Sequence, residues 1–297
     1  MPTPSPTPAP VGPNPHLVGL GNLLVPGLGE GLNGNWLTAA GKASFEIGTF
    51  FTGYELADEK GIASLDGIRE TYVPFTRRKR GTTSIEGQMY SNMLLEVSFK
   101  THMTNTFLAY RDAWAARGVT EGLDQHTFFS GFEMPFESKN LTNPWVYVPL
   151  LLVTGGLVAD YFMTERVDGQ RLNPSSNFLF ASHYGILEPI GSGWPEEAFY
   201  RGYLQHEVTL ATGAPALAIV AQAAAFALSH EAGAGQVSAF MVGTYLGYLA
   251  ERFHGDLGPG VTLHFWGGLF LGIETILVSH RNQKSTPPTA LGVQFTY

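Results

Sequence analysis

The sequence predicts an all-α fold, a polytopic transmembrane helix bundle with an accessory N-terminal helical region. Only 14% of the 297 residues are charged, against roughly 25% in an average soluble domain. Several uncharged apolar runs approach the roughly 20 residues that a helix needs to cross a bilayer core. Within them, Gly, Ala, Ser and Thr alternate with large apolar residues, which lets membrane helices approach closely. The competing interpretation is a soluble α-helical protein with a dry core, which would not depend on detergent for extraction.

Composition also excludes several functional classes. The chain contains no cysteine, so it has no disulfides, thiolate nucleophiles, iron–sulfur clusters or cysteine-type zinc sites. The formal net charge of −8 opposes binding to the phosphate backbone of nucleic acids. We therefore expect no nucleic-acid partner.

The N-terminal part divides into a tail and a helical region. Residues 1–16 are Pro-rich and are expected to form a disordered tail. Residues 17–140 form the helical region. Pro26 and several glycines interrupt its start, which predicts a short helix, a turn and a second helix over Leu37–Tyr54. Lys42 and Glu46 have the spacing of a helical ion pair. Residues 88–117 repeat apolar side chains with a helical period and predict a long amphipathic helix, either at the membrane interface or packed on the bundle.

Residues 141–285 are expected to form the membrane bundle, followed by a C-terminal tail over 286–297. Two small-xxx-small pairs within this part, Gly243 with Gly247 and Gly268 with Gly272, favour close helix packing. The uncharged runs that predict its helices are 141–159, 172–187, 208–229, 232–250 and 257–273.

The segment with the densest candidate chemistry is GSGWPEEAFYRGYLQHE, residues 191–207. Pro195 fits the first turn of a helix, where the carboxylates of Glu196 and Glu197 would suit the helix dipole. An ordinary helix start, with Glu197 paired to Arg201, therefore explains the segment without any chemistry. The apolar runs that follow favour a different interpretation, because ionisable groups at membrane depth usually line an interior site.

Two histidines lie in the runs that follow. His230 is four residues after Phe226, and His264 lies near the middle of the last run. A Glu and a His can hold and deprotonate a water molecule, and a second His can stabilise an oxyanion. Alternatively, Glu196, His230 and His264 would bind a divalent metal such as zinc. Neither an HExxH nor a GxSxG motif is present.

The motifs Glu196-Glu197-Ala-Phe-Tyr-Arg201, Phe226-Ala-Leu-Ser-His230 and His264, in this order, resemble the CPBP family. This family contains the CAAX prenyl proteases and bacteriocin-processing or immunity-associated relatives. The resemblance covers residues 177–280, about a third of the chain. It implies an intramembrane endopeptidase that acts on a membrane-associated protein or peptide.

By carry-over from the family, Glu196 activates water and His230 lies beside it. Glu197 and Arg201 support the site together with Phe226, and His264 helps to form the oxyanion site. The family leaves both a metal-dependent and a metal-free mechanism open, and we favour glutamate-activated water. The resemblance further implies a multi-pass protein in contact with membrane lipids, in the bacterial inner membrane.

The sequence departs from the family pattern at one position. The family's last motif usually has Asn or Asp four residues after the histidine, whereas this chain has Gly268. Loss of one oxyanion donor typically costs about 100- to 1000-fold in rate. Gly268 therefore supports an alternative function, a catalytically inactive family member that acts as a membrane scaffold or an immunity-type binding protein.

Overall fold

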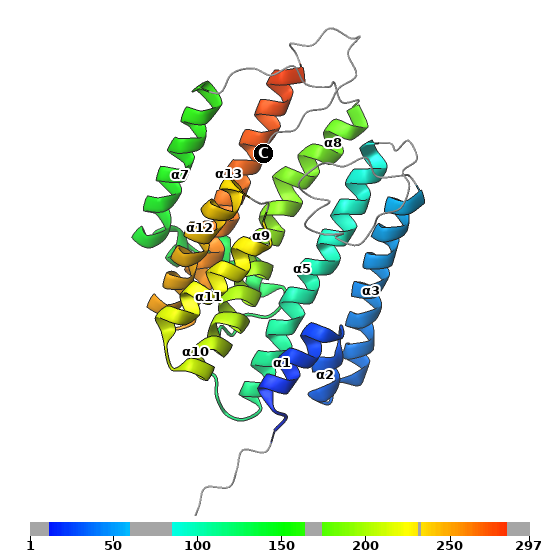
Figure 1. The fold of residues 1–297 in the computed structure, drawn as a ribbon, viewed down its shortest axis with the longest axis vertical. Helices are drawn as coiled ribbons and strands as arrows, with labels where there is room; N and C mark the ends of the chain where they lie inside the picture. Colours follow the sequence, from blue (N-terminus) through cyan, green and yellow to red (C-terminus); the bar gives the residue numbers. More distant parts are fainter. Residues whose placement is uncertain (1–11, 60–84, 164–173, 231–232, 284–297) are drawn as a thin grey trace, which may run out of the picture.

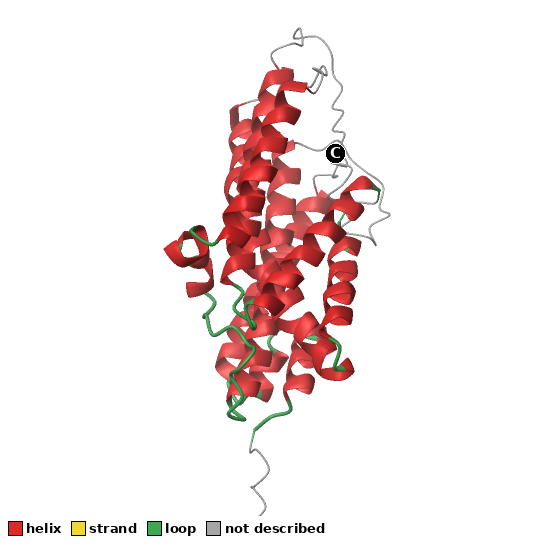
Figure 2. Ribbon diagram, turned by 90° about the vertical axis from the view of Figure 1, so that its left-hand side faces the viewer, coloured by secondary structure: helices red, strands yellow, loops and turns green. Residues whose placement is uncertain are grey.

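The computed structural model describes residues 12–59, 85–163, 174–230 and 233–283, and these ranges contain helices and loops without strands (Figure 2). The predicted all-α class is confirmed. Residues 1–11 of the Pro-rich tail and the whole C-terminal tail lie outside the described residues.

The N-terminal region contains four described helices (Figure 1): α1 (Pro15–Leu24), α2 (Leu28–Leu32), α3 (Trp36–Glu59) and α5 (Ile85–Ala115). The side chain of Asn14 caps α1 by accepting from the backbone N–H groups of His16 and Leu17. Gly27, with a φ of +80°, turns the chain after Pro26. The expected short helix, turn and long helix are present, and the one-turn helix α2 lies between them.

The expected pair of Lys42 and Glu46 does not form. Lys42 pairs with Glu30 of α2 instead. The carboxylate of Glu46 is bound by two residues of α5, at 2.7 Å from His102 Nδ1 and 2.5 Å from Asn105 Nδ2. Lys42 lies four residues before Glu46, as the helical spacing requires, but the carboxylate of Glu46 is buried. A buried carboxylate needs hydrogen-bond donors close by, and α5 supplies them.

The second part of the chain begins with short helical turns and continues as long helices. The elements are η1 (Ser130–Phe132), η2 (Met134–Phe136), α6 (Ser138–Leu141), α7 (Pro144–Met163), α8 (Pro174–Ser182), η3 (His183–Leu187), α9 (Glu188–Glu197), η4 (Ala198–Gln205), α10 (His206–Thr212), α11 (Pro215–Leu228), α12 (Ala234–Arg252) and α13 (Gly258–Gln283). Across the bundle, α3 packs on α5, α5 on α9, α9 on α13 and α13 on α7. Helices α11 and α12 pack on each other and on η4. The α9–η4 segment therefore lies at the centre, between α5 and α13.

Among the residues that the structure describes, two helices are long and apolar enough to cross a membrane, α7 and the Gly258–His280 part of α13. The predicted run 208–229 is divided, because Gly213 adopts a φ of +66° and a new helix starts at Pro215. The resulting α11 has 14 residues, which is short for a full span. Helix α7 exposes large apolar side chains such as Leu151 and Leu152, as expected of a surface that faces lipid.

Residues 174–212 form one continuous helical segment that includes the π-helical turns η3 and η4. Pro195 lies inside it rather than in a first turn, so the interpretation of Pro195-Glu196-Glu197 as a helix start is wrong. A proline lacks the N–H that an interior helix position normally donates, and the π-helical turns η3 and η4 lie on either side of the helix that contains Pro195. Glu196 and Glu197 consequently face neighbouring helices instead of a solvated helix end.

The core around this segment is aromatic. Trp194 and Phe107 are almost fully buried, and their rings meet edge to face at a centroid distance of 5.8 Å. Gly131 makes room for the indole of Trp194, since a Cβ at residue 131 would lie 2.2 Å from the ring. Contacts of this kind fix α9 against α5 and against the loop that carries η1.

The small pair on α12 permits the predicted close packing. A Cβ at Gly243 would lie 3.0 Å from the ring of Phe226, and one at Gly247 would lie 2.3 Å from the amide of Gln222. The backbone carbonyl of Gly243 also accepts hydrogen bonds, because no side chain of this residue covers it. Gly243 O accepts from Arg201 Nη2 at 3.3 Å and from Gln222 Nε2 at 2.8 Å. The pair therefore provides both space and hydrogen-bond acceptors.

We predict that Gly272→Ala destabilises the protein and that Gly267→Ala does not. A Cβ at Gly272 would lie 1.9 Å from the carbonyl oxygen of Tyr184 in η3, whereas nothing lies within 4 Å of one at Gly267. Overpacking of this kind costs about 1–3 kcal/mol, while an unhindered Gly→Ala change in a helix stabilises by roughly 0.5–1 kcal/mol. Thermal unfolding in detergent should place the Tm of Gly272→Ala below, and that of Gly267→Ala at or above, the wild-type value. Equal Tm values for the two variants would contradict the contact between α13 and η3.

Candidate active site

The two adjacent carboxylates of α9 contact opposite ring nitrogens of one histidine. His264 Nδ1 lies 2.9 Å from Glu197 Oε1, and His264 Nε2 lies 3.6 Å from Glu196 Oε2. Glu196 and Glu197 are buried. A carboxylate only accepts hydrogen bonds, so Nδ1 donates to Glu197 and Nε2 faces Glu196. The structure thus brings together three of the residues predicted from the sequence.

Arg201 balances the charge of Glu197. Its Nη1 lies 2.9 Å from Glu197 Oε1, one helical turn away, and its guanidinium carbon lies 4.6 Å from the centroid of the Phe226 ring. Both members of this ion pair are almost completely buried. Removing one partner of a buried pair leaves an uncompensated charge and typically costs about 3–5 kcal/mol. The pair therefore holds Glu197, and through it His264, in a defined position.

His230 lies just past the end of α11, next to the other site residues rather than bonded to them. Its Nδ1 lies 2.8 Å from the carbonyl oxygen of Phe226. Because a carbonyl only accepts, Nδ1 is the donor and Nε2 of the neutral ring is an acceptor. The ring of Phe226 lies 4.4 Å from that of His230 and 5.7 Å from that of His264. In the part of the chain that the structure describes, His230 makes no ion pair with Glu196 or Glu197.

Sequence analysis missed Lys100 of α5, whose ammonium group contacts Glu196 Oε1. Lys100 is buried, which is rare for a lysine without a paired charge. The sequence does place Lys100 within residues 88–117, the segment predicted to form an amphipathic helix. The sequence does not indicate which carboxylate Lys100 contacts. An N-terminal helix thereby contributes a charge to the candidate site.

The structure also shows what surrounds Gly268. A Cβ at this position would lie 3.6 Å from Pro189 Cα and 4.0 Å from Ser192 Oγ, so the small residue leaves space between α13 and α9. Trp266 does not replace the missing polar partner, because its Nε1 donates to the carbonyl of Pro135 at 2.9 Å. The hydroxyl of Ser192, one turn before Glu196 on α9, lies next to the vacant position.

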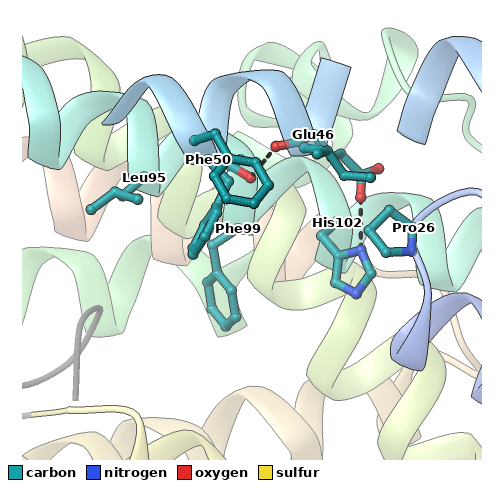
Figure 3. Close-up of a pocket in the computed structure, with 9 residues that line it drawn as sticks. Pro26, Glu46, Phe50, Leu95, Phe99 and His102 are labelled. Atoms are coloured by element: carbon teal, nitrogen blue, oxygen red, sulfur yellow. Dashed lines mark hydrogen bonds and ion pairs between the residues drawn. The ribbon is translucent and has the colours of Figure 1, made fainter. Parts of the chain in front are cut away.

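An apolar pocket of about 290 Å³ lies elsewhere, between α3 and α5 (Figure 3). Phenylalanines including Phe50 and Phe99 line it, and Glu46 with His102 forms its polar end. It contains none of the predicted site residues. Since Phe50 and Phe99 are exposed, the pocket is a feature of the apolar outer surface of the bundle and not of the candidate site.

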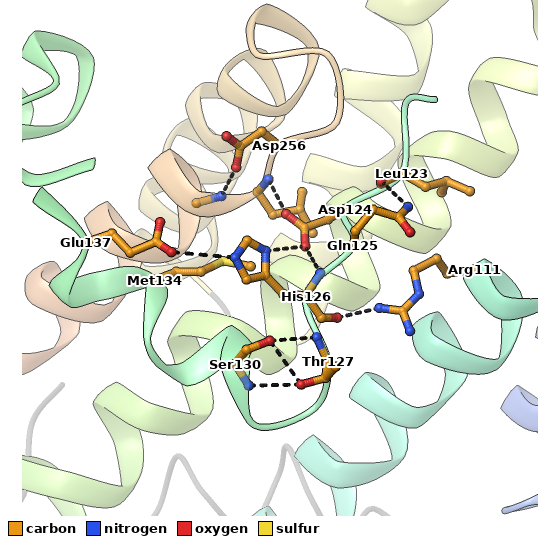
Figure 4. Close-up of polar contacts among 12 residues, drawn as sticks. Arg111, Leu123, Asp124, Gln125, His126, Thr127, Ser130, Met134, Glu137 and Asp256 are labelled. Carbon is orange, nitrogen blue, oxygen red and sulfur yellow. Dashed lines mark hydrogen bonds and ion pairs between the residues drawn. The ribbon is translucent and has the colours of Figure 1, made fainter. Parts of the chain in front are cut away.

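A second polar cluster fixes the loop between α5 and α7 (Figure 4). Asp124 Oδ1 accepts from the backbone N–H of His126 at 2.8 Å, and its Oδ2 accepts from the N–H of Leu257 at 3.0 Å. The ring of His126 lies 2.8 Å from Asp124 and 3.6 Å from Glu137. This cluster connects the loop to the start of α13, and it is structural because it lies among loop residues away from the α9 carboxylates.

Comparison with known proteins places the candidate site in a family. Residues 177–269 match the family model described as Rce1-like, type II CAAX prenyl endopeptidase. No curated protein and no solved structure gives a significant match to the chain. The matched segment runs from α8 into α13 and includes the two carboxylates, Arg201 and both histidines. The resemblance to the CPBP family is confirmed over this segment, and at the family level it supports an intramembrane endopeptidase.

We predict that the loop cluster makes stability depend on pH through His126. The hydrogen bond with Asp124 raises the pKa of His126 above its ordinary value, and burial opposes the rise. A histidine with a raised folded-state pKa stabilises fully below its unfolded pKa of about 6.5, and this contribution is lost as the pH rises through the folded pKa. The difference in Tm between wild type and His126→Gln should therefore shrink from pH 5.5 to pH 9. We expect the loss to be on the order of 1 kcal/mol, or about 2 °C.

The exposed His280 provides the control, since His280→Gln should reproduce the wild-type pH profile. A difference between wild type and His126→Gln that stays constant over this range would contradict the assignment.

Proposed function

We propose that this protein is an intramembrane endopeptidase that hydrolyses a membrane-associated protein or peptide with water activated by Glu196 and histidine. The observation that carries the proposal is the pair of carboxylates on one buried helix that engages both ring nitrogens of His264. An ordinary helix cap would not need this arrangement. The family match over residues 177–269 supports the same reaction class, and the two candidate spans α7 and α13 support a membrane location.

The hydrogen bonds define what each histidine can do. His264 donates through Nδ1 to Glu197, so its Nε2 becomes a donor only in the doubly protonated ring. The carboxylates of Glu196 and Glu197 lie on either side of the ring. His264 is then suited to stabilise an oxyanion. His230, whose neutral ring presents an acceptor at Nε2, is suited to orient the water.

Lys100 prepares Glu196 for the role of base. The ammonium group contacts Oε1, which leaves Oε2 on the side of His264. In the proposed reaction, Oε2 takes a proton from water while the water oxygen bonds to the carbon of the scissile carbonyl. The C–N bond of the tetrahedral intermediate then breaks, and Glu196 returns the proton to the leaving amine. This general acid–base contribution is worth about 100- to 10,000-fold in rate.

A zinc ion held by Glu196, His230 and His264 is the metal-dependent version of this proposal. In the described part of the chain, the ligand atoms of these three residues do not gather within 4.8 Å of one another, although another set does. Lys100 also contacts one of the two Glu196 oxygens. The described side chains do not fit such an ion, so no step of the proposed mechanism passes through a metal.

A second candidate function is supported by Gly268, which lacks the side chain that the resembled family places there. In this alternative the same bundle binds a partner without cleaving it, as a membrane scaffold or an immunity-type protein. Pro189 and Ser192 of α9 lie at ordinary van der Waals distances from a Cβ at residue 268, so no neighbouring side chain of the described residues takes the place of the family's polar residue there. The two candidates differ in whether new peptide termini appear in a substrate.

We predict that Glu196→Gln abolishes proteolysis and that His230→Ala lowers it by about 100-fold. The protein, reconstituted in lipid vesicles with a fraction of membrane proteins, is assayed by mass spectrometry of newly formed peptide termini. Glu251→Gln, an exposed change on α12, serves as the control and should retain activity. Unchanged cleavage in Glu196→Gln, with a wild-type Tm, would rule out the proposed base. Absence of cleavage in the wild-type protein while it captures a membrane partner would favour the scaffold.

We further predict that Gly268→Asn raises the rate of proteolysis. The new amide would restore a donor one helical turn after His264, and such donors are worth about 100-fold or more. A Cβ at residue 268 meets its neighbours at ordinary van der Waals distances, so the backbone can accept it. Gly267→Asn is the matched control, because nothing lies within 4 Å of a Cβ there. A rate that rises equally in both variants, or in neither, would contradict the assignment of residue 268 to the oxyanion site.

A further inference from the structure

We propose that Glu96, His183 and Glu188 form a binding site for a divalent transition-metal ion, separate from the candidate active site. Each residue offers one ligand atom, and these atoms lie within 4.8 Å of one another. Among the described residues, no other group of three such side chains meets this criterion. The three come from α5, η3 and α9, so an ion there would join the N-terminal region to the family-matched segment.

The π-helical turn η3 brings two of the ligands together. The backbone N–H of Glu188 donates to the carbonyl of His183, five residues earlier. In an α-helix, residues five apart point about 140° away from each other, because each residue turns the helix by about 100°. The wider π turn aligns residue i with residue i+5, so His183 and Glu188 share a face. Isolated π turns are often found at functional sites, and this one is directed at Glu96 of α5.

Two ligand atoms have no hydrogen-bond partner although they are buried. These are Glu96 Oε1 and His183 Nδ1, in residues that are only 3% and 7% exposed. His183 Nδ1 lies 3.5 Å from Glu96 Oε2, so it is directed into the cluster. A buried polar group without a partner destabilises the fold. A cation beside Glu96 Oε2 would give His183 Nδ1 the partner that it lacks.

The charges around the cluster also favour a cation. The carboxylates of Glu96 and Glu188 lie close together in the bundle, and the nearby ammonium group of Lys100 is in contact with a third carboxylate, Glu196. One lysine does not compensate three carboxylates. Buried like charges require either a cation or a shared proton. The two solutions differ in whether His183 Nδ1, which lies 3.5 Å from Glu96 Oε2, binds an ion or only faces a carboxylate that shares a proton with Glu188, and titration with a metal separates them.

The donor set indicates the class of ion. Two carboxylate oxygens and one imidazole nitrogen suit divalent ions such as Mn²⁺, Fe²⁺ and Zn²⁺, whereas Mg²⁺ and Ca²⁺ prefer oxygen alone. Glu188 lies eight residues before Glu196, which corresponds to about 12 Å along a helix. The ion would therefore lie outside the catalytic contacts. Because Glu96 is one turn before Lys100 on α5, the ion would fix the helix that carries Lys100 to Glu196.

The test uses the full-length protein in detergent, stripped with a chelator and titrated with Mn²⁺ alone under electron paramagnetic resonance. We expect one bound Mn²⁺ per chain and a loss of affinity of about 100-fold in Glu188→Gln and in His183→Gln. Glu46→Gln changes a buried glutamate outside the cluster and should bind Mn²⁺ as the wild type does. Glu196→Gln should also retain the ion, which separates this site from the catalytic one.

A spectroscopic measurement on the wild type keeps the test decisive if a variant fails to fold. Electron spin echo modulation of bound Mn²⁺ should show coupling to one imidazole nitrogen, and the signal should change when histidine is labelled with ¹⁵N. Absence of binding, absence of nitrogen coupling, or loss of the ion in Glu196→Gln but not in Glu188→Gln would each overturn the proposal. An infrared carbonyl band of a protonated acid that disappears in Glu188→Gln, without metal binding, would show the shared proton instead and overturn it as well.

Discussion

The structure depends on the pairing of buried charges in an apolar helix bundle. A charge removed from water is tolerated only when an opposite charge or several hydrogen-bond donors meet it. Glu197 satisfies this condition through Arg201, one turn away, and through His264 on another helix. Glu196 satisfies it through Lys100 of α5. These contacts fix the relative positions of α5, α9 and α13, so the packing of the centre of the bundle and the geometry of the candidate site have the same physical origin.

Small residues and helical irregularities make this pairing sterically attainable. Gly243 lets α12 approach α11 closely enough for its carbonyl to accept from Arg201. The π-helical turns η3 and η4 lie on either side of α9, and η3 brings His183 and Glu188 onto one face of the helix. Helix α9 therefore carries carboxylates for two sites. Glu188 at its start belongs to the proposed cation cluster, and Glu196 with Glu197 at its end forms the candidate catalytic pair.

The N-terminal region is part of this arrangement. Although the family match covers only residues 177–269, Lys100 lies in contact with Glu196, and Glu96 completes the proposed cation cluster. Both residues lie on one face of α5, one turn apart. The proposed protease therefore uses a helix outside the matched segment to set the charge of its base. An ion at the proposed metal site would hold α5 against α9 through Glu96, and it would thereby help to keep Lys100 next to Glu196.

The sequence by itself determined the helical class, the approximate extent of most helices, and the motif residues Glu196, Glu197, Arg201, His230 and His264, because hydrophobic period and motif spacing are local properties. The tertiary structure decided the partners. Lys42 was assigned to Glu46 by helical spacing but pairs with Glu30, since α5 supplies closer partners to Glu46 in the core. Pro195 was interpreted as a helix start but lies inside a helix, because the residues before it are also helical and pack against α5 and α13. Lys100, Glu96 and His183 gained their roles only when α5 packed against α9, a contact between residues about a hundred positions apart that no local pattern encodes.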